Sequence, residues 1–409
     1  MGPKEESSRA FWKGVATGLG IACVISLVTL GITYVAKNMQ SLMRIVRQAE
    51  IESVADESTL EKLSLLEETI DQYFWKDVEP QQLADGVYEG LLLALEDPYS
   101  EYYTHEELEA LMQQTQGIYY GIGAYVSLDT AAGYVQITQV IEGTPAEESG
   151  LMANDYIYMV DGEDMYGKDS TYVVGKIKGE ENSWVTITVI RETEPEPLDI
   201  EVQRRKIESP TVEYEMLENR MAYIQIVEFD DVTTNQFADA YAKAQSEGME
   251  GLIIDLRSNP GGNLSTVCNI CNMLLPEGLI VYTEDKYGTR EEYNCSGKNE
   301  IEVPLVVLTN GYSASASEIL AGAVKDYGIG KIVGTTTYGK GIVQRIINLS
   351  DGSAVKLTVS TYYTPKGNNI HEVGVSPDVE VELDAEQYLA GVDSQLEKAK
   401  EVLSEMLSD

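Results

Sequence analysis

Histidine is scarce in this 409-residue chain, which holds only His105 and His371. Two histidines so far apart exclude an HExxH zinc site, which needs both on neighbouring turns of one helix. They also leave few candidates for a Ser-His-Asp triad. Any hydrolytic chemistry is therefore expected to use other side chains.

Basic residues are also few, since 29 Lys and Arg stand against 68 Asp and Glu and give a formal net charge of -39 at pH 7. So acidic a surface repels the phosphate backbone of nucleic acids and anionic lipid headgroups. Nucleic acid is therefore not an expected partner. The sequence also lacks a Walker loop, and we expect no cofactor.

The chain has only four cysteines, Cys23, Cys268, Cys271 and Cys295. Cys268 and Cys271 form a CxxC pair in a segment with a helical pattern, but no second pair of Cys or His completes a tetrahedral metal site. We interpret them as buried structural thiols and expect no metal. A redox or metal role for the pair is the alternative.

One long uncharged segment is present at 15–36, between Lys13 and Lys37. Its length suits a helix that crosses a hydrocarbon core of about 30 Å. The segment is longer than a signal-peptide core and ends in a poor cleavage site, so we interpret it as an uncleaved signal anchor. Lysine and arginine are nearly balanced across it. Because single N-terminal anchors usually place the large domain outside, residues 1–14 are expected to be cytoplasmic, and the chain a single-pass protein of the cell membrane with an extracellular catalytic domain.

The hydrophobic pattern changes several times beyond this segment, which predicts a multidomain α/β protein. A Glu/Pro-rich connector at 192–198 indicates a domain boundary or a hairpin tip. The last amphipathic helix either docks on the core or forms a dimer contact. The expected parts are a helical N-terminal module at 39–116, a β-rich insert at 117–191, an α/β core at 192–383 and a C-terminal helix at 384–409.

Ser315 is the first candidate for chemistry, because small residues surround it where a buried strand is expected to turn into a helix. Its spacing to Glu318 also fits a capping box, which is the structural alternative. Lys340 follows between Gly339 and Gly341. A buried lysine with a lowered pKa can accept the serine proton, as in Ser-Lys nucleophilic catalysis, although a solvated charge is the ordinary role of a loop lysine.

A glycine turn supplies a third candidate group at Asn259 to Gly262, after an expected strand and before an expected helix. Backbone amides in such a turn can point at a developing oxyanion. A tight strand-to-helix turn without catalytic function explains the same residues, and the two interpretations are compatible.

Eight segments together resemble the carboxyl-terminal processing, or tail-specific, peptidases. They follow one another in the order expected for that family across most of residues 60 to 380. The segments are DPYSEYYT at 97–104, YGIGAYV at 120–126, GTPAEESGL at 143–151, DYIYMVDG at 155–162, DLRSNPGG at 255–262, NGYSASASEILAGAVKD at 310–326, GTTTYGKGIVQ at 334–344 and YYTPKGNNIHEVGVSPDV at 362–379.

The resemblance implies a role for each matching residue. Ser315 would be the nucleophile, with Ser313 and Ser317 as rivals. Lys340 would be the general base, and Gln344 would orient it. The oxyanion donors would be the amides of Gly261 and Ala316.

The insert at 117–191 resembles a PDZ domain, which binds an extended peptide at a sheet edge and holds its terminal carboxylate with loop amides. The candidate peptide-binding residues are Tyr120, Gly121, Ile122 and Gly123. Asn154 stands where the family commonly has glycine, but Asn tolerates a left-handed backbone.

The resemblance thus implies a membrane-anchored, ATP-independent serine endopeptidase that recognises the C-termini of protein or peptide substrates. The alternative from another class is an inactive extracellular PDZ scaffold that only binds peptides. A homodimer formed by the terminal amphipathic helices is a further expectation.

Overall fold

The computed structural model describes residues 54–408 and divides into two units, Met1–Ala84 and Asp85–Asp409. The first unit contains α2 (Glu57–Tyr73), which begins where the Asp56 carboxylate accepts the Thr59 amide at 2.7 Å. The membrane span predicted at 15–36 lies outside the described residues. Within 54–408, no helix is both long and apolar enough to cross a membrane.

The second unit begins within α3 (Pro80–Leu93) and continues into β1 (Glu101–Tyr103) and α4 (His105–Gln116). A complete capping box between Thr104 and Glu107 starts α4, and Gly117 ends it with a left-handed φ of 67°. The described part of this region thus consists of helices with one short strand between them. That strand, β1, pairs with β18 (Ala354–Tyr363), which lies far along the chain.

The β-rich insert folds around one sheet with the strand order β3, β4, β5, β7, β8, and β6 pairs with β5. Its buried residues alternate along the strands, as in Val135 and Ile137, and form a core of their own. The connector at 192–197 is the tip of the β7–β8 hairpin, so the boundary expected at 191 lies inside this sheet. The elements are β3 (Ala124–Asp129), β4 (Tyr134–Val140), α5 (Pro145–Glu148), β5 (Tyr156–Val160), β6 (Glu163–Asp164), α6 (Ser170–Ile177), β7 (Trp184–Ile190) and β8 (Leu198–Gln203).

A short antiparallel pair, β2 (Ile118–Gly121) and β9 (Arg205–Glu208), lies where the chain enters and leaves the insert. The core follows with a six-stranded sheet in the order β10, β11, β12, β15, β16, β19, parallel from β11 onward. Its strands are β10 (Val212–Met216), β11 (Met221–Ile226), β12 (Gly251–Asp255), β15 (Leu305–Thr309), β16 (Gly330–Gly334) and β19 (Val379–Glu380), with a 3-10 turn at Glu218–Arg220.

Helices cover both faces of this sheet. On one face, α7 (Thr233–Ser246), α8 (Leu264–Cys271) and α9 (Ala316–Tyr327) pack on residues such as Ile254 and Val307. On the other face, Leu403 of α11 (Ser394–Ser408) packs with Ile253 and Val306, after the short helix α10 (Ala385–Leu389). Strands β12 and β15 are buried throughout, as expected for a parallel sheet. The C-terminal helix therefore docks on the core.

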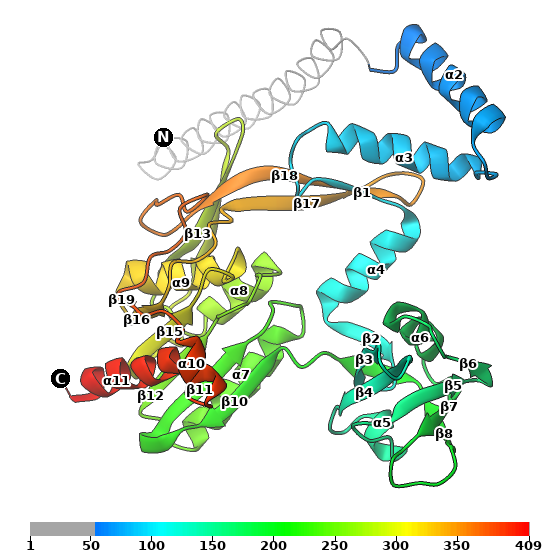
Figure 1. Cartoon of the computed structure of the whole chain (residues 1–409). Helices are drawn as coiled ribbons and strands as arrows, with labels where there is room; N and C mark the ends of the chain where they lie inside the picture. Colours follow the sequence, from blue (N-terminus) through cyan, green and yellow to red (C-terminus); the bar gives the residue numbers. More distant parts are fainter. Residues whose placement is uncertain (1–53, 409) are drawn as a thin grey trace, which may run out of the picture. The chain divides into compact units, whose positions relative to one another are not determined.

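A second sheet joins distant parts of the chain (Figure 1). It contains β1, β13 (Gly278–Asp285), β14 (Arg290–Cys295), β17 (Ile342–Asn348) and β18 (Ala354–Tyr363). In this sheet β18 pairs with β1, β13 and β17. In the parallel sheet of the core, β12 and β15 are neighbours, so the loops that follow them emerge at the same edge.

Candidate active site

Ser315 lies at the end of the loop that follows β15, as the residue immediately before α9. Its backbone has φ 56° and ψ -113°, a conformation that a serine rarely adopts. Such local strain persists only where the surrounding structure imposes it, and it is concentrated at functional sites. The side chain is partly exposed at the amino end of the helix.

The two rival serines have structural contacts instead. Ser313 and Ser317 are both fully buried. The Ser313 hydroxyl donates to the carbonyl of Leu256 at 2.7 Å, and the Ser317 hydroxyl donates to the carbonyl of Asn259 at 3.1 Å. Both hydroxyls thus fasten the loop after β15 to the turn after β12, which leaves Ser315 as the accessible hydroxyl of the three.

The glycine turn packs directly against Ser315. Gly261 has a φ of 110°, and a Cβ built there would lie 2.8 Å from the Ser315 Cβ and 3.0 Å from the Ala316 nitrogen. The buried Asn259 side chain holds the turn, donating to the Ile226 carbonyl and accepting the Gly261 amide, both at 2.8 Å. The turn therefore lies against Ser315 and the first residue of α9. In this conformation, however, the Gly261 amide is already hydrogen-bonded.

Ala316, the second expected oxyanion donor, is the first residue of α9. Amides of a first helical turn have no acceptor within their own helix, and the helix dipole makes this end favourable for negative charge. The position of Ala316 next to the glycine turn thus agrees with the expected role. Both oxyanion assignments stay predictions.

Lys340 is half-buried, and its amine lies 4.3 Å from the centre of the Tyr99 ring. Burial lowers the pKa of this amine from its ordinary value, and the positive charge of Lys356 lowers it further. No hydrogen bond joins the Lys340 amine to the Ser315 hydroxyl in the part of the chain that the structure describes. Burial thus favours the neutral amine that a general base needs, and the role expected of Lys340 stays a prediction.

Gln344 does not contact Lys340 through a hydrogen bond in the described part of the chain. Its side-chain amide donates instead to the Thr358 hydroxyl at 3.2 Å, from β17 to β18. The role expected of Gln344 therefore stays a prediction.

Glu318 joins the loop of Ser315 to the loop of Lys340, although the sequence pattern assigned it only to a helix cap. Its fully buried carboxylate accepts the Ser315 amide at 2.8 Å on one side. On the other side it accepts the Thr337 hydroxyl at 2.6 Å, the Gly339 amide at 2.7 Å and the Lys340 amide at 2.9 Å. One side chain thus fixes the backbone of the serine and the backbone of the lysine at the same time.

An ion pair behind the glycine turn supports the same edge of the sheet. Asp255, the last residue of β12, contacts Arg257 at 2.6 Å, and Arg257 reaches Asp393 at 2.8 Å. Both Asp255 and Arg257 are largely removed from solvent. The turn is thereby tied to the segment that precedes α11.

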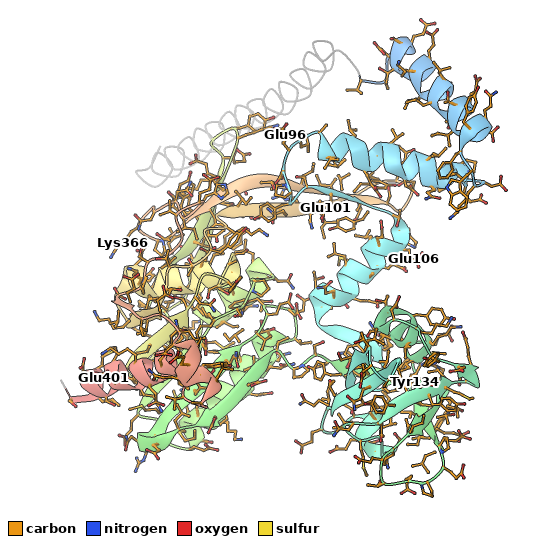
Figure 2. All side chains as sticks on the ribbon, viewed as in Figure 1. Glu96, Glu101, Glu106, Tyr134, Lys366 and Glu401 are labelled. Carbon is orange, nitrogen blue, oxygen red and sulfur yellow. The ribbon has the colours of Figure 1, made fainter. Side chains whose placement is uncertain are left out.

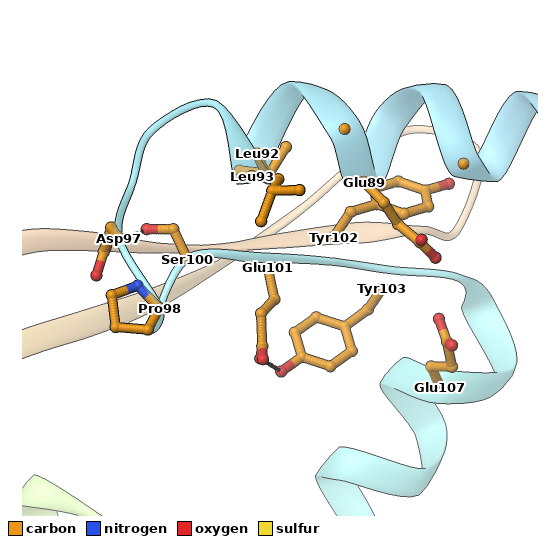
Figure 3. Close-up of a pocket in the computed structure, with 12 residues that line it drawn as sticks. Glu89, Leu92, Leu93, Asp97, Pro98, Ser100, Glu101, Tyr102, Tyr103 and Glu107 are labelled. Atoms are coloured by element: carbon orange, nitrogen blue, oxygen red, sulfur yellow. Dashed lines mark hydrogen bonds between the residues drawn. The ribbon is translucent and has the colours of Figure 1, made fainter.

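Two cavities lie beside the Asp97–Ser100 segment. One, of 660 Å³, lies between α3 and β1 and includes Leu92 and Leu93 in its wall (Figure 3). The other, of 700 Å³, extends along β18 to Arg345. Asp97 and Ser100 line both, and Asp97 also faces Lys340 electrostatically. Both cavities therefore border a carboxylate whose charge acts on the amine of the expected base.

The expected peptide-binding residues occupy the end of β2 and the connection to β3. The Ile122 carbonyl accepts the Ala146 amide at 2.8 Å, and the Gly123 carbonyl accepts the Ile141 amide at 3.0 Å. Gly123 has a φ of 88°, and a Cβ there would lie 2.4 Å from Thr144. The segment is thus a tightly fitted connection rather than an open loop, and its peptide-binding role stays a prediction.

No group of three or more metal-ligating side chains is found within residues 54–408. Cys268, Cys271 and Cys295 are free thiols, and burial raises the pKa of Cys268 to about 12. Thiols that resist ionisation are poor nucleophiles and poor metal ligands. The environment of these cysteines agrees with a structural role.

Three family models match the chain. "Peptidase family S41" matches residues 220–381, "PDZ domain" matches 136–191 and "Activating protease CtpB N-terminal domain" matches 26–107. The S41 match lies within the core and the PDZ match within the β-rich insert. The third match begins inside the apolar segment at 15–36 and extends over most of the helical module predicted at 39–116.

Curated relatives extend the similarity over most of the chain. A "Probable CtpA-like serine protease" of Staphylococcus epidermidis is 31% identical over 373 residues, covering 90% of this chain and 73% of the relative. One of the same description from Staphylococcus aureus strain COL is 33% identical over 330 residues, covering 80% of this chain and 66% of the relative. The chain thus spans just under two thirds of the length of that relative. Among solved structures, "Photosystem II D1 C-terminal processing protease" is 31% identical, with 78% of this chain and 86% of that chain covered and a TM-score of 0.46.

Replacing Glu318 tests whether its carboxylate holds the two loops. Glu318→Ala leaves four donors without their acceptor, and is expected to lower the free energy of unfolding by more than about 3 kcal/mol, since each unsatisfied buried group costs about 1–3 kcal/mol. Glu318→Gln keeps the shape but places an NH₂ among donors, so a smaller loss is expected. Urea unfolding of both variants measures this, and two losses below about 0.5 kcal/mol would contradict the bridging role.

Proposed function

Since the chain belongs to peptidase family S41, we propose that it is a serine endopeptidase in which Ser315 attacks the peptide carbonyl and Lys340 is the general base. The observation that carries the proposal is the Glu318 bridge, which fixes the strained Ser315 and the loop of the half-buried Lys340 in one frame. The relatives described as serine proteases support the same assignment.

The proposed reaction has two half-reactions. In the first, the neutral Lys340 amine accepts the Ser315 proton while the hydroxyl oxygen bonds to the substrate carbonyl, and the lysine then returns a proton to the leaving amine. In the second, water hydrolyses the acyl-enzyme with Lys340 again taking and returning a proton. Because the two side chains share no hydrogen bond here, the lysine has to approach the serine for catalysis.

The electrostatics of the site explain why a lysine can do this work. Above its pKa the amine is neutral and basic, and below it the amine is charged and inert. Burial lowers that pKa, which brings the neutral form to a lower pH than an exposed lysine reaches.

We also propose that the PDZ domain binds the C-terminal end of the substrate and that the catalytic site cuts upstream of it. The matched PDZ model and the separate core of the insert support an independent binding domain. The competing proposal, an inactive PDZ scaffold, predicts binding without cleavage. The accessible, strained Ser315 favours the enzyme.

The active-site proposal predicts a specific set of variant activities. Ser315→Ala should lower peptide cleavage by at least about 10³-fold, because the nucleophile is gone. Ser317→Ala, the matched control, removes only one buried hydrogen bond and should keep most of the activity. Lys340→Arg should be inactive, because a guanidinium stays charged at every relevant pH.

The same assay gives the pH dependence. The rate should rise with pH through the lowered lysine pKa and level off below the ordinary value of about 10.4. Equal turnover by wild type and Ser315→Ala would reject this serine. A flat profile from about pH 6 to 10, with chemistry shown to limit the rate, would reject the lysine base.

Tail recognition is tested with one peptide made in two forms, with a free C-terminal carboxylate and with a C-terminal amide. The free acid should be cleaved with a higher kcat/KM, because loop amides and the positive ends of peptide dipoles favour the carboxylate. A version acetylated at the amino end is the control and should behave like its unacetylated parent. Identical kcat/KM values for acid and amide would argue against PDZ capture of the tail.

Membrane anchoring and dimerisation are proposed separately. The apolar segment at 15–36 supports an anchor with the catalytic domain outside the cell. Exposed apolar side chains in the first unit, among them Leu65, Phe74 and Trp75, support a homodimer. To test the anchor, the full chain should sediment with membranes and a chain lacking residues 1–38 should not. To test the homodimer, light scattering of the shorter chain should give twice the monomer mass. Membrane binding by the shorter chain would refute the anchor, and a monomer mass would refute the homodimer.

A further inference from the structure

The segment Asp97–Ser100 reaches the expected base from a distant part of the sequence. The Tyr99 ring covers the Lys340 amine with 4.3 Å between the nitrogen and the ring centre. An aromatic face at this distance attracts an ammonium group and also excludes water from it. The roles proposed above for Ser315, Lys340 and Gln344 do not include this contact with Tyr99.

The backbone around Tyr99 is fixed by its own turn. The Asp97 carboxylate accepts the Tyr99 amide at 3.1 Å and the Ser100 hydroxyl at 2.6 Å. A carboxylate that accepts from the residues two and three positions later defines a rigid Asx turn. The ring is therefore presented on a fixed backbone rather than on a loose connection.

The same turn is bound to the strands that flank the base. The Thr358 amide of β18 donates to the Ser100 hydroxyl at 3.1 Å, and the Thr358 hydroxyl accepts from Gln344 at 3.2 Å. Immediately afterwards, β1 pairs with β18, where Glu101, labelled in Figure 2, forms an ion pair with Lys356 at 2.5 Å. The Asp97–Ser100 segment and the two strands thus form one hydrogen-bonded assembly around the lysine.

We propose that Tyr99 is a positioning residue for the catalytic base, whose ring holds the Lys340 amine in place and keeps bulk water away from it. This inference rests on the proposed Ser-Lys mechanism. Tyr99 acts through Lys340 and takes no part in bond making.

The charges around the amine explain why such shielding is needed. Three carboxylates favour the charged lysine, and only burial and one ammonium group oppose them, burial being the largest influence on the pKa. The hydroxyl of Tyr99 itself interacts with that of Tyr338. Within residues 54–408, the charged and titratable groups facing Lys340 are Asp97, Glu101, Glu318, Lys356 and Tyr99.

Removing the ring has two opposite effects on the pKa of Lys340: the lost attraction between the ring and the ammonium group lowers it, and the admission of water to the amine raises it. Because burial is the largest influence on this pKa and three carboxylates already stabilise the charged form, we expect the second effect to dominate and the pKa to rise. In the full chain, Tyr99→Ala should move the midpoint of the pH–rate profile about one unit towards alkaline pH, which lowers cleavage at neutral pH about tenfold and restores it at high pH. Tyr99→Phe keeps the ring face and should keep the wild-type midpoint.

Tyr102→Ala is the matched control from the same segment. Its ring packs on Tyr88, with 5.2 Å between ring centres, and not on Lys340. This variant leaves the Tyr99 ring and the Glu101 carboxylate in the chain and should keep the wild-type midpoint. A Tyr99→Ala profile with an unchanged or lowered midpoint, or an equal loss of rate at every pH in both alanine variants, would overturn the proposal.

A second measurement separates this inference from the proposed function. The acylation of the Lys340 amine by a succinimidyl ester, followed by mass spectrometry against pH, reports the same midpoint without any peptide cleavage. An alkaline shift in Tyr99→Ala together with an inactive wild type would support the positioning role and reject the peptidase. Cleavage that depends on Ser315 with no shift in either measurement would reject the positioning role alone.

Discussion

The arrangement of this active site depends on one buried carboxylate. Glu318 accepts hydrogen bonds from the Ser315 amide in one loop and from Thr337, Gly339 and Lys340 in another. A carboxylate with no exposed surface is stable in a protein only when such donors surround it. The need to satisfy this group therefore draws the Ser315 loop and the Lys340 loop into a single geometry, and the same contacts hold the unfavourable backbone conformation of Ser315.

The other loops at this edge are fixed by polar side chains in the same manner. Asn259 holds the glycine turn by two hydrogen bonds. The ion pair between Arg257 and Asp393 connects the start of the same turn to the segment before α11. Asn263, just after the turn, donates to the Thr115 carbonyl at 3.0 Å, next to the point where the chain enters the PDZ domain. The parallel sheet thus provides the common edge, and buried hydrogen bonds determine where each loop lies on it.

Much of this could be anticipated from local pattern. The apolar runs at β12 and β15, the helix after Ser315 and the helical segments before the insert follow from periodicity and turn residues, which act over a few neighbours. Three choices between alternatives depended on the tertiary structure. Burial showed that Ser313 and Ser317, the rivals of Ser315, have structural contacts. The pairing of β7 with β8 showed that 192–197 is a hairpin tip, and contacts with Ile253 and Val306 showed that α11 docks on the core.

Local sequence supplies the kinds of residue that are available: few histidines for a histidine-based triad, a serine before a helix, a lysine between glycines and a glycine turn after a strand. The tertiary structure alone decided that Tyr99 covers the Lys340 amine, that Glu318 joins two loops and that Gln344 bonds to Thr358. These contacts join residues far apart in the chain. Their energies depend on burial and on hydrogen-bond geometry, and neither quantity exists until the sheets have assembled.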